Sequence, residues 1–195
     1  MKLVDLIYPS IPLSTVGRIA ALTAAGALVG GFYGVLHDQV TYTIGPEYFT
    51  RFKFDQFSYA RPALDSPRLF AGIIGFLASW WVGALTAWVL ARVSVKREGL
   101  LPPHRVVAKS FALVFATTMV SGVIGYCWGL YRRTTGHSEG WRDWMAELGV
   151  IDEKAFMTVG YIHNASYIGG SVGMFFGIMY LIRWWQKERG RNRTL

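Results

Sequence analysis

The chain has 195 residues, of which 52% are apolar, 15% aromatic and 16% charged, and its net charge is +8. Soluble domains carry about 25% charged residues, so this composition excludes an ordinary soluble domain and predicts a protein surrounded by a lipid bilayer. A basic excess of this size would favour nucleic acid in a soluble protein. Here its distribution along the chain indicates membrane topology, and we expect no nucleic-acid partner.

Four apolar stretches are long enough to cross a hydrocarbon core of about 30 Å as helices. They cover about 15–36, 68–91, 107–130 and 158–182. The sequence therefore predicts an all-α polytopic membrane protein, with residues 1–195 forming a single membrane domain built on four transmembrane helices.

The charge differs between the two sides of these spans. The chain up to and into the first span, the 92–109 connection and the basic tail 183–195 carry +1, +4 and +4, whereas the 37–68 and 131–157 connections carry 0 and −1. Because basic residues are enriched in cytoplasmic segments, this pattern predicts that both termini are cytoplasmic. The longer segments 37–67 and 131–157 are then expected outside.

Each predicted span carries small residues at every fourth position, which lets helix backbones approach closely in lipid. The stripes are Gly26, Gly30 and Gly34; Gly75, Ser79, Gly83 and Ala87; Ser121, Gly125 and Gly129; and Gly169, Gly173 and Gly177. They predict a tightly packed bundle. The pattern leaves open whether the packing occurs within one chain or between copies.

The first outer segment is dense in Tyr and Phe. Residues 40–44 are β-prone and are expected to be extended. Pro46 at a first helical position predicts a short helix, and Phe49 and Phe52 lie on its apolar side. We expect this helix at the membrane interface.

The second outer segment places Trp141, Trp144, Met145 and Leu148 at i, i+3, i+4 and i+7. This spacing predicts a short amphipathic helix on the bilayer or on the first outer segment. Asp152 is expected to cap the helix that becomes the fourth span.

Polar side chains gather near the outer boundary. His37 ends the first predicted span, and His163 lies about 20 residues, or about 30 Å, from the inner end of the fourth. With an acid such as Glu47, these histidines have the side-chain types that bind zinc, copper or iron, although no H-x-x-x-H or C-x-x-C spacing is present. Glu47 is alternatively a helix-start charge paired with Arg51. The lone Cys127 is expected to be a small buried apolar residue.

The segments HDQVTYTIGPEYFTRFKF and YIHNASYIGG resemble a family of bacterial four-helix inner-membrane proteins. The resemblance covers the first outer segment and the fourth span. It implies a bacterial inner membrane and the same architecture, and it carries no function and no catalytic residues.

Two functional hypotheses follow. The first is a non-enzymatic scaffold or accessory subunit without a cofactor, which presents the outer aromatic residues to a partner protein, a lipid or a small ligand, including other subunits or a second copy. The expected contact residues are Tyr48, Phe49, Phe52, Trp141 and Trp144. The alternative is a metal-binding protein or metal-dependent membrane enzyme that uses His37, His163 and Glu47. The apolar centres of the spans lack ionisable side chains, which argues against an ion-coupled transporter.

Overall fold

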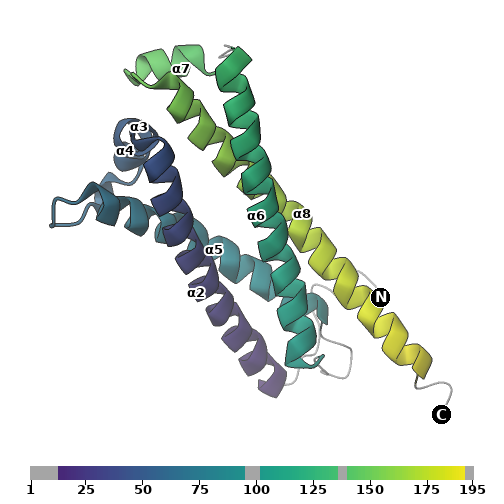
Figure 1. The fold of residues 1–195 in the computed structure, drawn as a ribbon. Coiled ribbons are helices and arrows are strands. Elements are labelled where there is room, and N and C mark those ends of the chain that lie inside the picture. Colours follow the sequence, from purple (N-terminus) through teal and green to yellow (C-terminus); the bar gives the residue numbers. More distant parts are fainter. Residues whose placement is uncertain (1–12, 95–101, 136–139, 192–195) are drawn as a thin grey trace.

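The computed structural model describes residues 13–94, 102–135 and 140–191. Four long helices dominate it: α2 (Leu13–Ile44), α5 (Pro67–Ser94), α6 (His104–Thr135) and α8 (Glu153–Arg191) (Figure 1). Each is long and apolar enough to cross a bilayer, and each predicted span lies inside one of them. The predicted all-α, four-span architecture is confirmed.

The long helices pack in pairs, α2 on α5 and α6 on α8 (Figure 1). The small residues lie at these contacts. A Cβ added to Gly30 would lie 2.8 Å from the Gly83 Cα, and one added to Gly173 would lie 2.8 Å from the Val114 Cα. Backbones this close leave no room for a side chain, so the stripes pack helices together within the chain.

Helix α2 does not end at His37. It continues to Ile44, so the predicted extended conformation of residues 40–44 is wrong. The helix stops only at Gly45 and Pro46, because proline lacks the amide hydrogen that would continue the hydrogen-bond ladder. Gly45 is required by packing as well: a Cβ there would lie 2.8 Å from the Ala155 carbonyl oxygen of α8.

The chain between α2 and α5 is compact. It forms α3 (Pro46–Tyr48), the π-helical turn η1 (Phe49–Lys53), α4 (Phe54–Gln56) and the 3-10 turn η2 (Ser58–Ala60). Pro46 lies in the first turn of α3, as predicted. The segment buries Tyr48, Phe49 and Phe54, so it forms part of the core.

The second connection contains α7 (Arg142–Glu147). Gly149 ends it with φ +64°, while the Gly149 and Val150 amides donate to the carbonyls of Ala146 (3.1 Å) and Met145 (3.0 Å). This is the Schellman pattern, in which glycine occupies the left-handed position at low cost. Asp152 then caps α8 as predicted, because its Oδ1 accepts from the Ala155 amide at 2.9 Å.

Both connections lie at the same end of the molecule, opposite the start of α2 and the end of α8 (Figure 1). We call this end, residues 45–66 and 140–152, the aromatic end. Its core joins side chains of both connections to α5 and α8, and the Phe52 and Trp144 rings lie 5.0 Å apart. Helix α7 therefore packs on the first connection, one of the two positions predicted for it.

Two further predictions concern the burial of Cys127 and the basic tail 183–195. Cys127 is exposed on α6, so its predicted burial is wrong: Gly125 and Gly129 of the same helix are the residues that turn towards α8. Residues 192–195 of the predicted basic tail lie outside the described residues.

Candidate functional site

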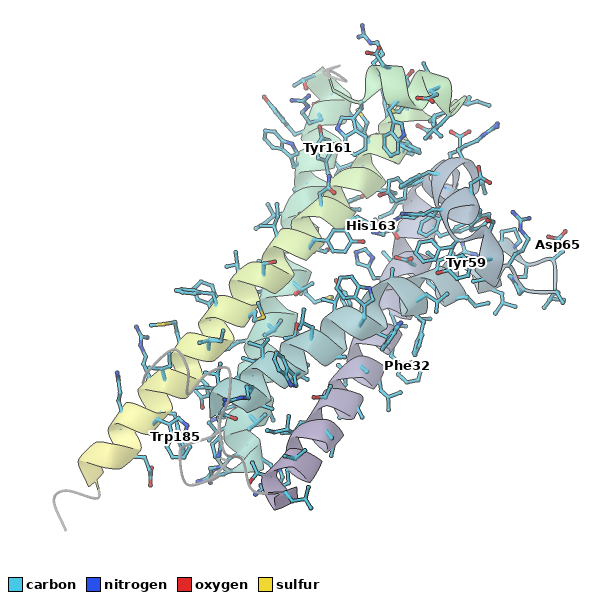
Figure 2. The ribbon with its side chains drawn as sticks, turned by 180° about the vertical axis from the view of Figure 1, so that it is seen from behind. Phe32, Tyr59, Asp65, Tyr161, His163 and Trp185 are labelled. Carbon is cyan, nitrogen blue, oxygen red and sulfur yellow. The ribbon has the colours of Figure 1, made fainter. Side chains whose placement is uncertain are left out.

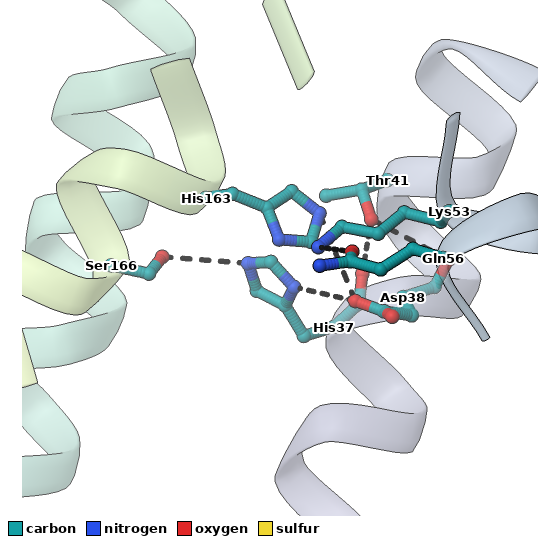
Figure 3. A network of polar contacts seen from close by, with 7 residues as sticks. All are labelled: His37, Asp38, Thr41, Lys53, Gln56, His163 and Ser166. Atoms are coloured by element: carbon teal, nitrogen blue, oxygen red, sulfur yellow. Dashed lines mark hydrogen bonds and ion pairs between the residues drawn. The ribbon is translucent and has the colours of Figure 1, made fainter. Parts of the chain in front are cut away.

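Three ionisable side chains meet between the two helix pairs, just below the aromatic end. His37 and Asp38 come from α2 and His163 from α8, and their side chains are 13%, 6% and 6% exposed (Figure 3). All three lie within helices that are able to span a membrane. Seen from behind, His163 points from α8 towards the end of α2 and the first connection (Figure 2).

The helix boundaries position these residues. Because α2 continues past His37, His37 and Asp38 are held on rigid helical backbone one full turn or more from its end. The Thr41 hydroxyl donates to the His37 carbonyl at 3.0 Å within that last stretch. On the other helix, the Asp152 cap sets the start of α8 and therefore the level of His163.

One polar atom of the cluster lacks a hydrogen bond among the described residues. The His37 Nδ1 lies 3.1 Å from the Asp38 Oδ1, and its Nε2 lies 3.4 Å from the Ser166 hydroxyl oxygen (Figure 3). The His163 Nε2 lies 3.8 Å from the same Asp38 oxygen, beyond hydrogen-bond range, and has no hydrogen-bond partner among the described residues. A buried polar atom left unpaired costs about 1–3 kcal/mol.

Aromatic rings hold the imidazoles in place. The Tyr48 ring stacks on His163 at 5.0 Å and 24°, and the two histidine rings meet edge-on at 4.6 Å. Burial raises the pKa of the Tyr48 hydroxyl above its ordinary value, so this tyrosine stays neutral. The stack leaves His163 little freedom to turn its unpaired nitrogen towards another group.

One basic residue joins the cluster from the first connection. Lys53 of η1 reaches towards Asp38 and His163, and its ammonium donates to the Gln56 Oε1 at 3.0 Å (Figure 3). Burial lowers the pKa of Lys53 and the Asp38 carboxylate raises it, with burial the larger effect. The site therefore contains one acid, one base and two imidazoles.

This donor set fits a metal ion. One ligand atom from each of His37, Asp38 and His163 can be chosen so that all lie within 4.8 Å of one another. A tetrahedral ion with bonds of about 2.1 Å separates its ligand atoms by about 3.4 Å. The separations from the Asp38 Oδ1, 3.1 Å to His37 and 3.8 Å to His163, bracket that value. If the His37 Nδ1 faced the ion, its Nε2–H would donate to Ser166, the type of outer partner that orients metal-binding histidines.

Two cavities flank His37. One, of about 440 Å³, lies between α2 and the α6/α8 pair and is lined almost entirely by apolar groups. The other, of about 500 Å³, lies between the two helix pairs and reaches all three ionisable side chains and Lys53. The site is therefore open to a ligand from the space between the pairs.

Glu47, the acid named from the sequence, lies elsewhere. Its Oε2 accepts from the amides of Ile151 (3.0 Å) and Asp152 (2.6 Å) at the start of α8, and its Oε1 lies 4.0 Å from Arg51. The structure brings His37 and His163 together with Asp38 and leaves Glu47 outside the cluster. The sequence offers one indication that Asp38 belongs to the cluster. Asp38 follows His37 directly, and both lie within α2 because this helix continues beyond them.

The aromatic residues expected to contact a partner pack against other residues of the same chain. Tyr48 and Phe49 are buried, and Phe52 contacts Trp144. Trp141 lies 5.4 Å from Tyr161 of α8, ring to ring. That they contact a partner stays a prediction.

The chain was compared with known proteins by three routes. No family model, no curated protein and no solved structure matches it.

Proposed function

We propose that this protein is an integral membrane metal-binding protein that holds one divalent transition-metal ion between α2 and α8 through His37, Asp38 and His163. The observation that carries the proposal is the His163 Nε2, which is buried, faces the Asp38 carboxylate at 3.8 Å and lacks a hydrogen-bond partner among the described residues.

The three ligand residues lie within helices that are able to span a membrane. An ionisable side chain within a membrane span is costly, and such residues are commonly kept for function. A divalent ion would compensate the Asp38 charge and accept both imidazole lone pairs. Two histidines and one carboxylate are donors that zinc and iron(II) use, and three protein ligands leave a coordination position open, as in catalytic sites.

The proposal includes a side of the membrane for the site, which the charge pattern of the sequence supports. If basic residues mark the cytoplasmic side, the aromatic end faces outwards and the metal lies near the outer boundary of the bilayer. The resemblance noted from the sequence favours a bacterial inner membrane.

Elemental analysis tests the proposal. The purified chain, in nanodiscs, is stripped of metal, exposed in turn to zinc, iron(II) and copper, and compared with His37→Ala, His163→Ala and Asp38→Asn. We expect one ion per chain and a loss of affinity of more than tenfold in each variant, because each removes a ligand. His104→Ala is the matched control, since His104 is exposed at the start of α6.

Failure would be unambiguous. A chain that takes up none of the three metals, or that keeps its metal in all three ligand variants, does not use this site.

A partner-binding role is the second candidate, and it would use other residues than those named from the sequence. The large apolar side chains exposed at the aromatic end are Tyr59, Leu64 and Ile151, at 78%, 67% and 82%. Substituting all three with serine and testing for loss of a co-purifying protein or lipid separates this role from metal binding.

A further inference from the structure

The larger cavity is a cleft between the two helix pairs. Its walls come from all four long helices, and its volume of about 500 Å³ falls in the range of small-molecule sites, about 300–1,000 Å³. Several wall residues are about half exposed, including Val29 (49%), Trp81 (52%) and Leu85 (50%), so the cleft is not enclosed by protein. Because its walls belong to helices that are able to span a membrane, its opening faces the bilayer.

Polarity changes along the cleft. One end holds His37, Asp38, His163 and Lys53, together with Ser166 and Tyr167. From there the cleft extends along α8 to Met174, which is eleven residues beyond His163 or about 16 Å at the helical rise. Apart from a few hydroxyls, that length is lined by apolar side chains. A matching ligand has a polar head and an apolar tail.

The charged groups at the polar end of the cleft determine which kind of ligand head group can bind there. Asp38 is the one carboxylate, and Lys53 the one amine, among the residues that line the cleft. A divalent ion on the three ligands makes this end positive, and its open coordination position adjoins the cleft because all three ligand residues line it. Lys53 adds ammonium donors, one of which Gln56 already uses. An anionic oxygen head complements this end, whereas a neutral head does not.

We infer that the cleft binds a long-chain carboxylate from the bilayer, with its head at Lys53 and the metal position and its tail between the helix pairs; this inference rests on the proposed metal site.

The test uses a dodecanoate that carries a diazirine photolabel, with the zinc-loaded chain in nanodiscs of neutral phosphatidylcholine. Labelled peptides should map to the cleft segments of α5 and α8. We expect unlabelled dodecanoate to compete at least tenfold better than dodecanol at equal membrane concentration, a difference of about 1.4 kcal/mol. Lys53→Met should reduce that preference, because it removes the ammonium donors and leaves the zinc in place.

Gly170→Leu is the variant that fills the cleft. The nearest atom to a Cβ at Gly170 is the Thr118 hydroxyl oxygen at 3.5 Å, so the first carbon fits and the rest of the side chain occupies the tail position. We expect labelling to fall at least tenfold while zinc remains at one ion per chain. Gly17→Leu, at a glycine with nothing within 4 Å, is the matched control.

Metal content is measured on every sample before the label is added, so the two proposals fail separately. Absence of zinc in the wild-type chain contradicts the proposed function. At full zinc occupancy, equal competition by dodecanol, by a neutral quinone or by a diacyl phospholipid would overturn the present inference. Unchanged labelling of Gly170→Leu would also overturn it.

Discussion

The contacts inside each helix pair differ in kind from those between the pairs. Inside a pair, glycines bring two backbones together, as where Gly30 meets Gly83. Between the pairs lie two cavities and the cluster of His37, Asp38 and His163. Close backbone packing makes each pair a rigid support, and the looser contact between the pairs leaves room for a ligand. In this protein the small-residue stripes serve as support, and the ionisable cluster lies between the pairs, where the stripes do not meet.

The largest expected effect comes from the contact inside a pair. A Cβ at Gly34 would overlap the Gly75 carbonyl oxygen of α5, so Gly34→Leu forces the two backbones apart. We expect the free energy of unfolding in mixed detergent micelles to fall by about 3 kcal/mol, at the upper end of overpacking effects. Gly17→Leu is the control and should change it little. Equal stability of the two variants would contradict the packing role of the stripe.

A smaller effect is expected where the first connection holds the start of α8. Glu47→Gln removes a charged acceptor from the amides of Ile151 and Asp152, which should lower the free energy of unfolding by about 1–2 kcal/mol. Metal content should not change, because Glu47 lies outside the cluster. Glu147→Gln, at an exposed site on α7, is the control. Loss of metal in Glu47→Gln alone would return Glu47 to the ligand set.

The smallest effect concerns the contact between the two connections. The Phe52 and Trp144 rings lie 5.0 Å apart at 80°. A double-mutant cycle with Phe52→Ala and Trp144→Ala should give a coupling free energy of about 1 kcal/mol, typical of edge-to-face pairs. Phe52→Ala with Tyr59→Ala is the matched cycle, since Tyr59 is exposed, and it should give a coupling near zero. A Phe52–Trp144 coupling no larger than that of the matched cycle would show that the connections fold independently.

The four-helix architecture follows from the sequence alone. Hydrocarbon thickness and the rise of a helix set the number and approximate place of the spans, while local chemistry set the Pro46 helix start and the Asp152 cap. The same counting placed His37 and His163 at one level, and in the structure their rings lie 4.6 Å apart.

Which residues form the site, and which helices pair, depends on contacts that exist in the folded chain alone. Polar residues at 37–39 suggest the end of a span, but α2 continues to Ile44 because its last turns pack on α8 and on the first connection. Because the helix continues, Asp38 lies in the cluster. The Glu47 carboxylate instead accepts from the Ile151 and Asp152 amides, just before α8. A small-residue stripe marks the packing face of one helix but does not name its partner. The pairing of α2 with α5 and of α6 with α8 depends on contacts between segments distant in the chain.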